Sequence, residues 1–166
     1  MKILGEKSLS SKVVIGLKIL FAIISLIDLI VLWIMIKLLN GNMQNDLLHL
    51  AFLVMIILTG IIALYIIYQF IEIFKNLKNN ILFSINNVKR LNAVSNSCFI
   101  ISVIYFAISA VSIFIINNFM GELIGYILMF SITLTVIFIV SGIGVKILNE
   151  IYKKAIEYKE ENDFTI

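Results

Sequence analysis

Residues 17–36 read LKILFAIISLIDLIVLWIMI, a stretch in which Lys18 and Asp28 are the only charged residues. An apolar segment of about twenty residues is the length that an α-helix needs to cross about 30 Å of hydrocarbon. In lipid such a segment can satisfy its backbone hydrogen bonds only as a helix or as a strand of a closed barrel. The apolar segments of this chain do not alternate between apolar and polar residues as barrel strands do, so each should be a helix. We therefore predict an all-α fold, a four-helix transmembrane bundle forming one domain over residues 1–166. The four spans are residues 17–36, 50–71, 98–116 and 123–145.

The composition excludes a water-soluble fold. Hydrophobic residues make up 61% of the chain and charged residues 14%, with a mean hydropathy of +1.10, whereas soluble domains are about half apolar and a quarter charged. The lipid bilayer is therefore the expected partner of the apolar segments. The first of them is longer than the apolar core of a signal peptide and precedes no small-residue cleavage site, so we interpret it as a retained span.

Side chains that could carry chemistry are few. Cys98 is the only cysteine, which excludes an intramolecular disulfide and a cysteine-based zinc site. Asp46 and His49 lie three residues apart, but two ligands are too few for a metal centre. The serines and threonines lack a histidine or lysine base at a recognisable spacing. We therefore predict no enzyme activity, no metal and no cofactor.

Lysine and arginine are distributed asymmetrically along the chain. They precede or open the first span, separate the second span from the third and follow the fourth, which leaves only Lys37 on the opposite side. The positive-inside rule then places both termini and the middle loop in the cytoplasm. Beside apolar segments these cations act as topology signals and headgroup contacts, so we expect no direct binding of nucleic acid. They are Lys2, Lys7, Lys12, Lys18, Lys75, Lys78, Lys89, Arg90, Lys146, Lys153, Lys154 and Lys159.

Two helical features are predicted on the cytoplasmic side. In the middle loop, Ser84 is positioned to cap a helix with apolar residues at every third position. The fourth span should continue as a helical extension that is followed by a tail, together residues 146–166, because an apolar stripe persists to Tyr158 and Glu150 and Lys154 form a favourable i,i+4 pair. At about 1.5 Å per residue, this extension projects roughly 20 Å beyond the membrane. The stripe consists of Ile147, Leu148, Ile151, Ala155 and Tyr158.

Asp28 is the most informative single residue. It lies ten residues from Lys18, near the bilayer midplane, where a charged carboxylate costs roughly 2.5 to 3.5 kcal/mol on insertion scales. It should therefore face other helices, and residues at a similar depth form a candidate polar layer. One interpretation is coupling to protons or cations, and the other is a protonated carboxyl that hydrogen-bonds across helices and fixes their packing. The residues at this depth are Thr59, Gly60, Tyr105, Ser109, Thr133 and Thr135.

Two segments carry a resemblance to a known family. Residues 81–91 read ILFSINNVKRL and residues 157–166 read EYKEENDFTI. With four spans in a chain of this length, they resemble the bacterial membrane proteins grouped as domain of unknown function 2975, which are YoaS-like, over essentially the whole chain. In one departure, Leu82 stands where the family often has proline. The resemblance implies a multi-pass protein of the bacterial plasma membrane, and a partnership with a helix-turn-helix regulator.

Our leading hypothesis is a regulatory or sensory membrane protein whose cytoplasmic face binds a soluble partner. The alternative for the same residues is that they only lock the inner ends of the helices together. A second hypothesis is a small proton-coupled transporter or immunity-type protein, a homo-oligomer that uses Asp28. The candidate partner-binding residues are Phe83, Ser84, Asn87, Lys89, Arg90, Glu161, Asn162, Asp163, Thr165 and Ile166.

Overall fold

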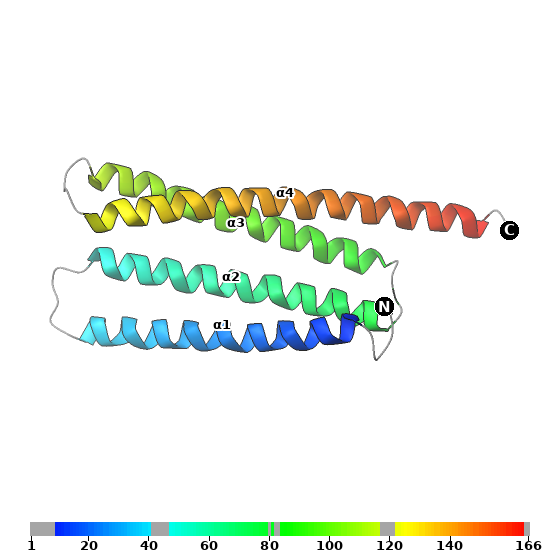
Figure 1. Ribbon diagram of the computed structural model, residues 1–166, viewed down its shortest axis with the longest axis horizontal. Coiled ribbons are helices and arrows are strands. Elements are labelled where there is room, and N and C mark those ends of the chain that lie inside the picture. The colour runs from blue at the N-terminus through cyan, green and yellow to red at the C-terminus, as the bar shows by residue number, and fades with distance from the viewer. Residues whose placement is uncertain (1–8, 41–46, 80, 82–83, 117–121, 165–166) are drawn as a thin grey trace. The chain divides into compact units, whose positions relative to one another are not determined.

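The computed structural model describes residues 9–40, 47–79, 81, 84–116 and 122–164. Over these residues it is all-α, and each of its four helices is long and apolar enough to span a membrane. This confirms the predicted all-α class with four helices of membrane-spanning length, and each predicted span lies within one helix (Figure 1). The helices are α1 (Leu9–Asn40), α2 (Leu47–Lys78), α3 (Ile85–Ile116) and α4 (Glu122–Phe164).

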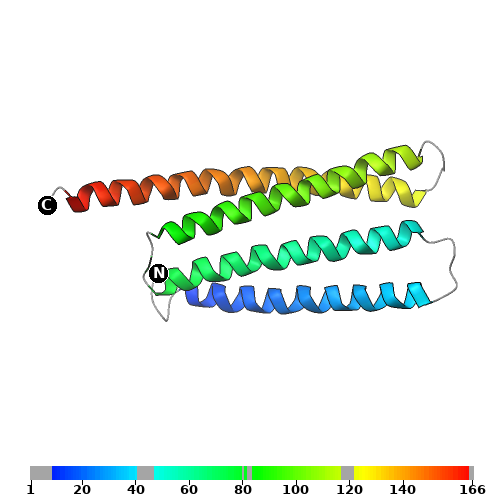
Figure 2. The same cartoon turned by 180° about the vertical axis from the view of Figure 1, so that it is seen from behind.

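The chain divides into two compact units, Met1–Asn87 and Val88–Ile166. The first holds α1 and α2, and the second holds α4 and nearly all of α3. Within each unit the two helices run antiparallel, as the views from both sides show (Figures 1 and 2). Each unit is therefore a helical hairpin with a packing seam of its own.

The seam of the first hairpin is apolar toward its basic end. On α1, Val14 is buried, and on α2, Ile67 and Ile71 are buried against it. Residues that recur at intervals of three and four lie on one face of a helix, so each helix presents one row to the other. The partly buried residues that pack on this cluster are Leu17, Ile24 and Phe74.

The seam of the second hairpin is built from small residues. Ser95 on α3 is fully buried and its Oγ donates a hydrogen bond of 2.9 Å to the backbone oxygen of Gly142 on α4. The hydroxyls of Ser109 and Ser131 lie 2.9 Å apart across the same seam. Small residues let two membrane helices approach closely, and buried hydroxyls then bond across the gap. Serine and glycine therefore hold α3 against α4.

On α1 and α2 the buried residues lie toward the lysine-rich ends, whereas on α3 and α4 they are spread along the seam. On α1 the buried residues are Ser10 and Val14, and described residues beyond Val14 on that helix are at most partly buried. On α4, Asn149 and Ile156 are still buried although they lie beyond the predicted span. The long apolar stretches carry exposed side chains, as helices whose outer surface is covered by lipid do.

Candidate functional site

Asp28 lies on the face of α1 that meets α2, with its carboxyl group directly over Gly60. A Cβ atom built on Gly60 would lie 2.5 Å from the Asp28 Cγ atom, closer than real carbon atoms approach. A carboxyl group in the apolar seam therefore fits only because α2 has no side chain at that position. Depth in the bilayer, counted along the sequence, placed Gly60 at the level of Asp28, and in the structure the two residues are in contact.

The described residues leave one oxygen of this carboxyl unsatisfied. Oδ2 of Asp28 is buried and has no hydrogen-bond partner among them. Thr59, which precedes Gly60, turns its hydroxyl to its own helix and bonds the backbone oxygens of Met55 at 3.0 Å and Ile56 at 2.9 Å. Because buried polar groups are normally hydrogen-bonded, the unsatisfied oxygen makes Asp28 a candidate site for a proton, a water molecule or a cation.

The other residues of the predicted polar layer lie in the second hairpin. Ser109 bonds Ser131 across the seam and the backbone oxygen of Tyr105 at 2.9 Å. The Tyr105 ring stacks on that of Phe138, with 6.3 Å between centroids. Sequence reasoning left Ser131 out of the layer, although it lies four residues before Thr135 on one helical face.

The two threonines of the layer that lie in the second hairpin bond to their own helix. Thr135 is buried and donates to the backbone oxygen of Ser131 at 2.8 Å. Thr133 is exposed and donates to the backbone oxygen of Met129 at 2.9 Å. Within the second hairpin the structure therefore joins Ser109, Ser131 and Thr135, whereas Thr133 points elsewhere. The layer as one continuous site stays a prediction.

At the start of α3 the predicted cap is confirmed. The Ser84 hydroxyl accepts a hydrogen bond of 3.2 Å from the backbone N–H of Asn86, and α3 begins at Ile85. The Asn87 side chain is fully buried, and its Oδ1 accepts a hydrogen bond of 2.7 Å from Nδ2 of Asn76 near the end of α2. Asn87 therefore joins the two helix ends, as the alternative interpretation of this segment expects.

The charged candidates of this segment are more accessible. Lys89 is exposed and Arg90 is half-buried. On α2, Lys75 forms an ion pair of 2.6 Å with Glu72, one turn earlier on the same helix. Among the candidates near the start of α3, Lys89 is therefore the side chain best placed to meet another molecule.

The last part of α4 carries the remaining candidates. Glu161 and Asn162 are exposed, and the backbone of Asp163 lies within α4. Phe83, Thr165 and Ile166 lie outside the described residues.

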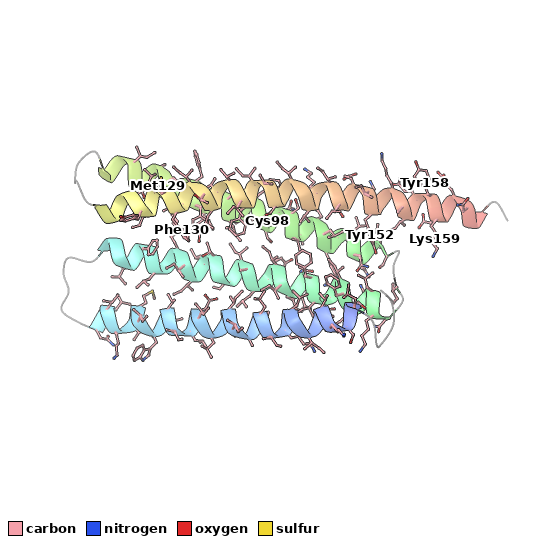
Figure 3. All side chains as sticks on the ribbon, viewed as in Figure 1. Cys98, Met129, Phe130, Tyr152, Tyr158 and Lys159 are labelled. Carbon is pink, nitrogen blue, oxygen red and sulfur yellow. The ribbon has the colours of Figure 1, made fainter. Side chains whose placement is uncertain are left out.

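From Lys146 onward, α4 presents three different faces. One is buried and contains Asn149 and Ile156, which are 7% and 9% exposed. A second is apolar and exposed, with Leu148 at 57%, Ile151 at 60% and Tyr158 at 66%. Tyr152, Tyr158 and Lys159 project from this part of α4 in Figure 3. The third face is charged and consists of Lys146, Glu150, Lys153, Glu157 and Glu160.

The comparisons with known proteins identify a family. The family described as "Protein of unknown function (DUF2975)" matches residues 9–166, which is nearly the whole chain. No curated protein and no solved structure matches it. The match covers both hairpins, the α2–α3 connection and the last part of α4, so the chain, a multi-pass membrane protein, belongs to the DUF2975 family.

Proposed function

We propose that this protein is a regulatory or sensory protein of the bacterial plasma membrane that binds a soluble cytoplasmic protein, such as a helix-turn-helix regulator. In this proposal both termini and the α2–α3 connection face the cytoplasm, because the lysines and arginines gather at that end of the helices. The single cation at the other end, Lys37, lies 4.1 Å above the Trp33 ring. Such an aromatic and cationic pair is typical of a membrane interface.

The extension of α4 carries the proposal. If the span ends near Val145, the helix continues to Phe164, or about 28 Å into the cytoplasm at about 1.5 Å per residue. Its exposed face includes Ile151 and Tyr158, and in this proposal both lie beyond the hydrocarbon. A row of exposed apolar side chains in water marks a protein interaction site.

The proposal assigns different roles to the family-like residues. Asn87 is fully buried and bonds Asn76, so its role is to fix the inner ends of the helices. Lys89, Glu161 and Asn162 are exposed and remain candidates for partner contact.

In-cell photo-crosslinking tests this function. A photoreactive phenylalanine analogue is placed at Tyr158 and, as a matched control, at Lys153 on the charged face of the same extension. We expect the Tyr158 position to yield an adduct with one cytoplasmic protein that co-purifies with the native chain, and the Lys153 position to yield much less. Adding Ile151→Glu should abolish the adduct. If neither position crosslinks a second protein, while impermeant labels place both positions in the cytoplasm, the proposal is wrong.

One observation favours a second function, small proton-coupled transport or an immunity-type role. The carboxyl of Asp28 lies over Gly60 with one buried oxygen unsatisfied among the described residues. An acid at this depth can gain and lose a proton during transport. Flux of protons measured in liposomes, with the Asp28→Asn variant as comparison, tests it. The absence of any flux that depends on Asp28 would remove this function and leave the partner-binding proposal intact.

A further inference from the structure

The exposed apolar face of the α4 extension has the spacing of a helix-binding seam. Leu148, Ile151, Ala155 and Tyr158 recur at intervals of three, four and three residues, so all four lie on one side of the helix. Three are more than half exposed and Ala155 is half-buried. This spacing corresponds to positions a, d, a and d of a heptad, the pattern that packs against a second helix. The face already in use, which includes Asn149 and Ile156, is a different one.

Two lysines occupy positions that flank this face. With Leu148 and Ala155 at position a, Lys154 occupies position g and Lys159 occupies position e, one on each side of the seam. Both lysines are exposed. Glu161 follows Lys154 by seven residues and comes only at the end of the helix. A helix that packs here therefore meets a positive charge on either side of its own apolar row.

A second copy of this chain is a poor occupant of this face. Two copies inserted in the same orientation would pair their α4 helices in parallel, with a two-fold axis between them. In a parallel pair, position g of one helix faces position e of the other. Lys154 of each copy would then face Lys159 of the partner copy, which creates two repulsive contacts. Acidic residues at those positions of a different helix would replace the repulsion with attraction.

From this arrangement we infer that the face formed by Leu148, Ile151, Ala155 and Tyr158 binds an amphipathic helix of a cytoplasmic partner that carries acidic residues beside its apolar row. The inference rests on the proposed cytoplasmic binding function and names the chemistry of the partner. Apolar side chains supply the affinity, and Lys154 and Lys159 supply the selection for acidic flanks.

Two designed peptides test the inference on the full chain in lipid nanodiscs. Both have the same length and the same Leu and Ile seam, and they differ only in carrying Glu or Lys at the flanking positions. We expect the Glu-flanked peptide to bind roughly tenfold more tightly, with a difference that shrinks as salt is added. Ile151→Glu should abolish binding of both. Equal binding of the two peptides, or tighter binding of the Lys-flanked one, would overturn the inference.

A pair of matched variants separates charge at this seam from charge elsewhere on the extension. Lys154→Gln should remove much of the preference for the acidic peptide. Lys153→Gln, which removes the same charge from the neighbouring charged face, should leave the preference intact. Equal effects of the two substitutions would show that the preference reflects total charge and would contradict the inference.

Disulfide trapping tests directly whether a second copy of this chain occupies the face. In a Cys98→Ser background, Ile151→Cys is oxidised in native membranes. We expect monomer, and a dominant disulfide-linked dimer would overturn the inference in favour of self-association.

Failure of this inference is distinguishable from failure of the proposed function. A specific adduct at Tyr158 without a preference for acidic peptides rejects only the partner chemistry, whereas a lack of adducts in cells rejects the function itself.

Discussion

The carboxyl group of Asp28 on α1 occupies the space that a side chain at position 60 of α2 would fill. This pairing of the acid with a glycine explains how an ionisable residue is accommodated in an apolar seam. It also makes the fit sensitive to a single methyl group, because protein interiors tolerate added volume poorly.

Gly60→Ala should therefore destabilise the protein. The new Cβ would overlap the Asp28 carboxyl and force the hairpin apart locally, at a cost of about 1 to 3 kcal/mol. Thermal unfolding in detergent measures the effect, and Gly144→Ala is the control, since a Cβ there has nothing within 4 Å. Asp28→Ala should restore stability to the Gly60→Ala variant. If Gly60→Ala and Gly144→Ala unfold at the same temperature, the contact is absent.

Asn87→Ala should destabilise the lysine-rich end of the first hairpin. It would leave the Asn76 amide, which bonds Asn87 at 2.7 Å, without that partner, and such losses cost about 1 to 3 kcal/mol. Asn86→Ala is the matched control because the Asn86 side chain is exposed. Denaturation in detergent, followed by circular dichroism, compares the two. Loss of partner crosslinking by Asn87→Ala without loss of stability would instead indicate a direct role in binding.

The hydroxyls of Ser109 and Ser131 should be energetically coupled. They lie 2.9 Å apart and are both buried between α3 and α4. In a double-mutant cycle with Ser109→Ala and Ser131→Ala, we expect a coupling energy of about 0.6 kcal/mol, the usual value for such bonds between membrane helices. Thr133→Ala paired with Ser109→Ala is the control, since Thr133 is exposed and bonds its own helix. Strict additivity for both pairs would argue against the bond.

Impermeant thiol labels should reach Lys37→Cys and Lys153→Cys from opposite sides of the membrane. Each substitution is made in a Cys98→Ser background, and intact spheroplasts are compared with inverted vesicles. We expect Lys37→Cys to react in spheroplasts and Lys153→Cys to react in inverted vesicles, because the cation-rich ends stay in the cytoplasm. Reaction of both from one side would reject the proposed orientation, and with it the cytoplasmic binding function.

The membrane helices were predictable because their signal is local. A segment such as residues 17–36 has to be a helix in lipid whatever it contacts, and hydrocarbon thickness sets its length. The cap at Ser84 was predictable for the same reason, since it depends on the few residues that follow.

Contacts between helices were harder to predict. The residue opposite Asp28 is Gly60, and a glycine has no polar side chain that would indicate a contact with a carboxyl group. The bond between Asn76 and Asn87 joins residues eleven apart in the sequence and depends on how the chain turns between α2 and α3. Which polar groups meet also depends on how each helix is rotated about its axis, and depth in the bilayer does not fix that rotation.

The hairpin organisation has a consequence for the order in which the protein is made. Asp28 and Gly60 belong to the same hairpin, which precedes α3 and α4 in the chain and leaves the ribosome before them. The Asp28 carboxyl can therefore pack against Gly60 as soon as α1 and α2 leave the translocon. Asp28, the residue that is most costly to insert into the bilayer, therefore does not depend on α3 or α4 for this contact.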